Sequence, residues 1–214
     1  SQPVMLNAKP GDLKLTKEQI IEPLVKEDIK FISMGLISDE KMPVIWRGPM
    51  VSGAVMQLLS QTDWGNLDYL IVDTPPGTGD VQLTLLQRIP LTSSVIVTTP
   101  QEVSISDCKK GIEMINKLGL PISGLIENMS WFQPDKEGRK YYLFGKDGGK
   151  KLADEYSLDL LGQLPLIELE ENKNLMENEV LKIEFSSIAD KLEKSVKNLK
   201  EKKSDGIPQV NISK

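Results

Sequence analysis

The string YLIVDTPPGTGD at residues 69–80 contains the residue types best suited to phosphate chemistry. Four apolar residues lead into Asp73, so we expect a buried strand to end there and to place its carboxylate at the carboxyl edge of a sheet, where open α/β sheets bind ligands. A carboxylate at this edge suits the water shell of a magnesium ion on nucleotide phosphates, because that ion keeps several waters and prefers oxygen partners. Asp73 is therefore predicted to contact Mg²⁺ through water.

The Pro/Gly run after Asp73 has the composition of a switch loop. Pro75 and the next proline fix the backbone, whereas Gly77 and the glycine after Thr78 let main-chain amides approach a phosphate. Asp80 then begins or caps the next helix. Such a turn could sense a γ-phosphate. The alternative is an ordinary Pro/Gly turn, which is common after an isolated apolar run ending in Asp and much less common for the whole string.

Short apolar runs alternate with helical patterns from Phe31 onward, which is typical of a parallel sheet with crossover helices. The expected strands are 31–37, 67–73, 93–99, 122–128 and 158–164. The expected helices are 50–61, 79–88, 102–118 and 184–201. We predict a doubly wound α/β domain over residues 1–201, with helices on both faces of a mostly parallel sheet. Residues 1–30 are expected to be loop-rich, and 202–214 to form a flexible tail.

Composition excludes several classes of function. The net charge of -5 argues against nucleic acid as a partner, and no apolar run approaches the ~20 residues of a membrane-spanning helix. The 214 residues contain no histidine and one cysteine, Cys108, so an internal disulfide is excluded and zinc or acid–base chemistry is disfavoured. Cys108 shares a helical stripe with isoleucines and is expected to pack inward. We expect a reducing compartment, with mitochondrial matrix and cytoplasm both open.

Several strings in register carry a family resemblance. DTPPGTGD, together with VIWRGPM (44–50), ENMSWF (127–132) and LFGKDGGKKLA (143–153), resembles the Mrp/ApbC (NUBPL-like) family of P-loop ATPases that carry iron–sulfur clusters. The similarity runs from Ser1 to about Pro165. The resemblance implies a P-loop NTPase fold, Mg-ATP binding, a homodimer or a larger assembly, and iron–sulfur client proteins. Its mitochondrial branch implies assembly of respiratory complex I.

The chain departs from the family pattern in its phosphate loop. The family's GKGGxGKS/T loop is absent from the sequence, and the Gly–Gly–Lys at 148–150 follows the wrong strand. We therefore expect the N-terminal strand and its loop to lie outside this chain, and the sheet to be completed by a longer polypeptide or by another chain. The chain is not expected to hydrolyse ATP alone.

The second departure concerns the cluster. In the family, two CxxC cysteines between the NMS-aromatic and LFG segments bind a [4Fe–4S] cluster shared by two subunits, and Pro134 and Glu137 stand at those positions here. Proline offers no ligand, so cluster binding in the family manner is expected to be lost unless Cys108 or a partner supplies thiols.

Two further residues are candidates for binding. Asn128 follows a predicted strand and could read an adenine edge with its amide, as the family resemblance also implies; the alternative is a turn-forming amide. Gln163, Leu164 and Pro165 would then line the base pocket. Arg47 could face phosphate or a partner carboxylate, or form a structural ion pair.

Three functions fit these features. The first is an ATP-binding iron–sulfur cluster carrier, and the second is a degenerate relative that serves as a structural or assembly subunit. The third, a partitioning ATPase of the MinD or ParA sort, is disfavoured by the acidic composition.

Overall fold

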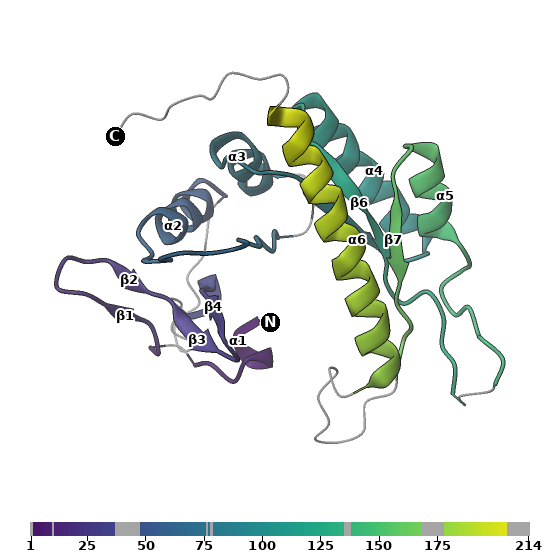
Figure 1. Cartoon of the computed structure of the whole chain (residues 1–214), viewed down its shortest axis with the longest axis horizontal. Coiled ribbons are helices and arrows are strands. Elements are labelled where there is room, and N and C mark those ends of the chain that lie inside the picture. The colour runs from purple at the N-terminus through teal and green to yellow at the C-terminus, as the bar shows by residue number, and fades with distance from the viewer. Residues whose placement is uncertain are drawn as a thin grey trace. The chain divides into compact units, whose positions relative to one another are not determined.

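The computed structural model describes residues 2–9, 11–36, 48–75, 77, 79–134, 138–167 and 178–204. The chain divides into two compact units, Ser1–Arg88 and Ile89–Lys214, and each is described by itself (Figure 1). Arg47, Glu137 and the tail after Ser204 lie outside the described residues. The single domain expected over 1–201 stays a prediction.

The second unit contains a parallel sheet in the order β5–β6–β7. Its strands are β5 (Ser94–Thr98), β6 (Ile122–Glu127) and β7 (Leu160–Gln163). They confirm the strands predicted at 93–99, 122–128 and 158–164. The crossover helices are α4 (Glu102–Lys117) and α5 (Gly148–Glu155), so this unit has the expected α/β architecture.

Helices cover both faces of this sheet. Figure 1 shows α6 (Glu179–Ser204) on one face and α4 with α5 on the other. The helix predicted at 184–201 begins earlier because Asn178 caps it: Oδ1 accepts the N–H groups of Val180 and Leu181 at 3.0 and 3.2 Å. The core between α6 and the sheet consists of Leu161, Leu164, Leu181 and Ile188. A Cβ on Gly162 would lie 2.7 Å from Ile188 Cδ1, so this close strand–helix approach requires glycine.

The first unit begins with two antiparallel hairpins, where the sequence predicted loops. Its elements are α1 (Gln2–Met5), β1 (Lys14–Leu15), β2 (Ile21–Glu22), β3 (Leu24–Lys26), β4 (Ile29–Phe31), the 3₁₀ helix η1 (Met34–Leu36), α2 (Gly48–Ser60) and α3 (Asp80–Arg88). The helices predicted at 50–61 and 79–88 are thereby confirmed to within two residues.

The strand predicted at 31–37 is wrong. Glu27 and Asp28 both have positive φ, 49° and 63°, and form the two-residue turn that pairs β3 with β4. Phe31 therefore ends a strand instead of beginning one. Its side chain packs with Ala8 and Leu36, and the chain turns immediately into η1.

The strand predicted at 67–73 is not formed either. No strand in the described part of the chain pairs with this segment, so Leu67, Tyr69, Leu70 and Ile71 are exposed, Ile71 to 88%. The apolar run indicates burial, but β structure also requires a neighbouring ladder. Among the described residues, the two hairpins pair within themselves except for one bridge between Ile21 and Thr62, which lies before this segment. The segment instead lines a hollow of about 1000 Å³ in the first unit, together with residues of β4, α2 and α3.

Polar contacts join α4 to α5 in the second unit. Lys109 Nζ lies 2.7 Å from Glu155 Oε1, and the Tyr156 hydroxyl donates to Glu113 Oε1 at 3.1 Å. The hydrogen bond to Glu155 raises the pKa of Lys109 above 10.5. Partial burial, and then the bond to Glu113, raises the pKa of Tyr156 above 10.0. Both pKa values are raised, so these contacts stabilise the fold at neutral pH and are lost as the pH rises through the alkaline range.

We predict that Glu113→Gln lowers the titration midpoint of Tyr156, because the neutral amide no longer favours the protonated phenol. NMR titration of the tyrosine ring carbons measures this midpoint. Glu102→Gln, on the exposed first turn of α4, is the control and should leave it unchanged. An equal shift in both variants would contradict the assignment.

Candidate functional site

The carboxyl ends of β5, β6 and β7 bring several predicted residues together. Asn128 directly follows β6, and its N–H donates to the Thr98 carbonyl at the end of β5, at 2.7 Å. The chain after β6 then runs beside the chain after β7: Leu164 N–H donates to the Glu127 carbonyl at 2.8 Å, and Ser130 N–H to the Leu164 carbonyl at 2.9 Å. Asn128 and the buried Pro165 therefore lie at the same end of the sheet.

The Asn128 side chain makes a local bond. Its Oδ1 accepts the N–H of Met129 at 2.9 Å, and Met129 has a left-handed φ of 55°. The side chain thus makes a local contact with the next residue of the chain, at the point where the backbone turns after β6. Asn128 is half-buried, and among the described residues its amide nitrogen has no hydrogen-bond partner, so both of its N–H groups are left to donate. The local contact is therefore compatible with base reading.

A buried carboxylate that sequence reasoning missed underlies this arrangement. Glu127, the last residue of β6, is 1% exposed. Its Oε1 accepts hydrogen bonds from Ser130 Oγ at 2.6 Å and from Gln163 Nε2 at 2.7 Å, and its Oε2 accepts one from the Gly149 N–H. The signal in the sequence was a charged residue ending the apolar run ISGLIE.

The glycine pair of FGKDGGKKLA explains how α5 reaches this carboxylate. A Cβ on Gly149 would lie 2.9 Å from Glu127 Cβ, and one on Gly148 would lie 2.9 Å from Pro100 Cα. Only glycines therefore let the start of α5 approach the ends of β5 and β6. The N-terminal N–H groups of a helix need acceptors and favour negative charge, and Glu127 meets both requirements.

The predicted switch residues lie in the first unit. Asp73 is exposed and follows no strand, so its expected place at a sheet edge is wrong for this structure. Its Oδ2 accepts a hydrogen bond from Gln2 Nε2 at 3.0 Å. The Pro75 carbonyl accepts one from Gln82 Nε2 at 2.5 Å, and Gly77 has a positive φ of 94°. Asp80 begins α3, as predicted.

The two predicted groups of site residues belong to different units. Asp73, Pro75, Gly77 and Asp80 are in Ser1–Arg88, whereas Asn128 and Pro165 are in Ile89–Lys214. Pro76 and Thr78, which belong to the same turn as Pro75, lie outside the described residues.

The described residues offer no site for the cluster. They contain no group of three or more His, Cys, Asp or Glu side chains placed to hold a metal ion. Cys108 is half-buried on α4, and its thiol donates to the Val97 carbonyl at 3.5 Å. Pro134 is exposed. A single thiol does not fit a [4Fe–4S] cluster, which needs several thiolates.

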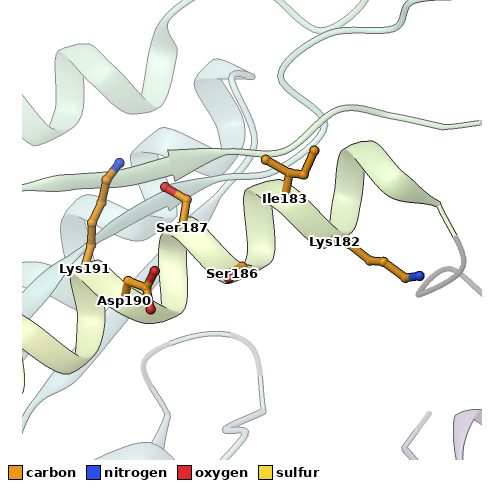
Figure 2. A pocket seen from close by; sticks show the side chains of 6 residues that line it. All are labelled: Lys182, Ile183, Ser186, Ser187, Asp190 and Lys191. Carbon is orange, nitrogen blue, oxygen red and sulfur yellow. The ribbon is translucent and has the colours of Figure 1, made fainter.

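A separate open hollow of about 510 Å³ lies along α6. Figure 2 shows its lining side chains pointing in different directions instead of converging on one point. The residues are Lys182, Ile183, Ser186, Ser187, Asp190 and Lys191. Lys191 is already engaged, since its Nζ donates to the Leu161 carbonyl at 2.8 Å. Among the described helices, none is both long and apolar enough to span a membrane.

Residues 1–200 match the family described as ParA: NUBPL iron-transfer P-loop NTPase. The chain belongs to this family. It is 48% identical to the iron-sulfur cluster transfer protein NUBPL of Mus musculus, over 78% of this chain and 52% of that protein. It is 45% identical to the iron-sulfur cluster carrier protein of Pseudomonas fragi, over 78% of this chain and 58% of that protein. The chain thus spans about half the length of these curated relatives.

A solved structure of the same kind resembles this NUBPL-family chain. It is a nucleotide-binding protein from Archaeoglobus fulgidus in complex with ADP. The TM-score is 0.64 at 28% identity, with 87% of this chain and 68% of that chain covered. These matches confirm the expected Mrp/ApbC resemblance and the α/β P-loop fold class.

We predict that Gly149→Ala destabilises the chain by about 1–3 kcal/mol, because the added methyl group collides with the Glu127 side chain. The sign of the change in the free energy of unfolding tests the steric clash, because alanine in place of a helical glycine otherwise stabilises by about 1 kcal/mol. The matched control is Gly111→Ala in α4, where a Cβ meets nothing within 4 Å. Urea unfolding followed by circular dichroism compares the two variants. Equal stabilisation by both would contradict the close approach of α5.

Proposed function

We propose that this chain is the base-binding and switch-bearing portion of an iron–sulfur cluster carrier of the NUBPL family. The chain holds the base weakly by itself, and it binds Mg-ATP fully when a phosphate-holding loop is supplied by a longer polypeptide or by another chain. The observation that carries the proposal is the position of Asn128 beside Leu164 and Pro165 at the carboxyl end of the parallel sheet. The ADP complex of the Archaeoglobus fulgidus protein supports an adenine nucleotide.

Asp73 fits a role on magnesium through water. Its carboxylate is exposed, and its bond to Gln2 engages only Oδ2, which leaves Oδ1 for a water molecule. Magnesium on nucleotide phosphates keeps most of its waters, so one protein carboxylate is sufficient for this role. Pro75, Gly77 and Asp80 then form the turn that responds to the phosphates.

The cluster is the cargo of this proposed function, and its thiolates come from outside the chain. Cys108 is the one cysteine in the sequence. The partners are a second subunit or a larger assembly, and iron–sulfur client proteins. Relatives of eukaryotic and of bacterial origin match at similar identity. We propose the mitochondrial matrix with respiratory complex I as the client, and the cytoplasm as the alternative compartment.

The base site is tested by NMR titration of the full chain with ADP, a method that detects millimolar affinities. ADP is expected to shift the amide signals of Asn128 and of residues 163–166. Asn128→Ala should weaken ADP binding by about tenfold, because it removes hydrogen bonds to the base. Asn116→Ala on the exposed end of α4 is the matched control. ADP-induced shifts confined to other regions, or equal effects of both variants on ADP binding, would contradict the proposed base site.

A degenerate structural or assembly subunit is the second candidate. Pro134 and Glu137 at the positions of the family's two cysteines favour it. Anaerobic reconstitution with iron and sulfide tests whether this chain supplies cluster ligands of its own. We expect no cluster absorption from the chain as it stands, and absorption with dimer formation after Pro134→Cys and Glu137→Cys. Cluster uptake by the unaltered chain would contradict the assignment of the cargo thiolates to a partner.

A further inference from the structure

We infer that Glu127 is the positioning residue that sets adenine over guanine preference at the base site. This inference rests on the proposed nucleotide binding and deepens it. It concerns a buried charged side chain that has no contact with the nucleotide in the proposed function.

The first step is the chemistry of the Glu127 carboxylate. An ionised carboxylate only accepts hydrogen bonds, and the groups that reach it come from three elements: Ser130 Oγ, Gln163 Nε2 and the Gly149 N–H. A buried carboxylate is costly unless such donors surround it. The Gln163 Nε2 group and the Gly149 N–H can only donate. In Glu127→Gln, the new amide nitrogen would therefore face one of these donors.

The second step is the orientation of Gln163. Its amide nitrogen donates to Glu127 Oε1 at 2.7 Å, and this bond fixes which side of the amide carries the nitrogen and which the oxygen. The Gln163 oxygen remains the atom available to other groups at this end of the sheet. Without the carboxylate, rotation of the amide by half a turn would exchange its oxygen and nitrogen at little cost.

The third step is the turn that carries Asn128. Glu127, on its N-terminal side, is held by its side chain and by its carbonyl, which accepts the Leu164 N–H at 2.8 Å. Ser130, on the other side, is 2% exposed and bonds back to Glu127. Asn128 is thus held from both directions, with its Oδ1 engaged by Met129 and its amide nitrogen left to donate.

These orientations leave an amide donor on Asn128 and an amide acceptor on Gln163. In the proposed pose the Asn128 donor reaches ring position 1 of the base and the Gln163 acceptor reaches position 6. Adenine presents an acceptor nitrogen at position 1 and a donor amino group at position 6, whereas guanine presents a donor N–H and an acceptor oxygen at these positions and is mismatched at both. Glu127 therefore favours adenine without touching it, through the two amides that it orients.

The experiment measures the affinities of the full chain and its variants for ADP and GDP by NMR titration. Glu127→Gln is expected to reduce the ADP-to-GDP preference by about tenfold. In the Asn128→Ala background the same change should have a much smaller effect, because the two residues act together. Glu113→Gln, a surface change in the same unit, is the matched control and should leave the preference unaltered.

If Glu127→Gln does not fold, Gln163→Leu serves as the second variant. It is expected to fold, because Glu127 retains Ser130 and Gly149 as donors. It should lose the base preference in the same way. Equal weakening of ADP and GDP, or additive effects of Glu127→Gln and Asn128→Ala, would overturn the role of Glu127 alone. Failure of the unaltered chain to bind ADP would overturn the proposed nucleotide site, and this role with it.

Discussion

The second unit depends on a carboxylate buried at the end of a strand. Glu127 accepts hydrogen bonds from a turn, from the end of β7 and from the first turn of α5, so one side chain connects three segments that are far apart in sequence. Removing any donor would leave part of a buried charge uncompensated, which costs more than a lost surface hydrogen bond. The geometry at this end of the sheet is therefore constrained by electrostatics as well as by packing.

That constraint explains residue choices that otherwise look unrelated. Gly148 and Gly149 allow α5 to approach the strand ends, and Ser130 supplies a hydroxyl short enough to reach back to Glu127. Gly162 performs a comparable steric role on the other face, where it makes room for Ile188 of α6. Small residues thus stand where backbones approach closely, and the large apolar side chains fill the core between them.

The sequence predicted the second unit well because each of its strands is followed by a helix with its own apolar stripe, and local patterns are sufficient to recognise such units. In the first unit it predicted the two longer helices but not the strands. LDYLIVD has the composition of a buried strand, but strand formation depends on a partner ladder that no local pattern reports. The hairpin turn at Glu27–Asp28 lacks the usual Asn-Gly signal. Glu127 was missed because its burial depends on donors 22 and 36 residues away.

The residues proposed to bind the base and those expected at the cluster-ligand positions lie in different segments of the chain. The positions of the family's two cysteines, Pro134 and Glu137, lie between the turn at Ser130 and the start of α5. Among the described residues, the groups that contact the Glu127 carboxylate come from outside that intervening segment. The described partners of the carboxylate are therefore supplied by other parts of the chain than the segment expected to correspond to the family's cluster ligands. The residues proposed to orient a base are thus held by a structural constraint that does not depend on the residues expected at the positions of the cluster ligands.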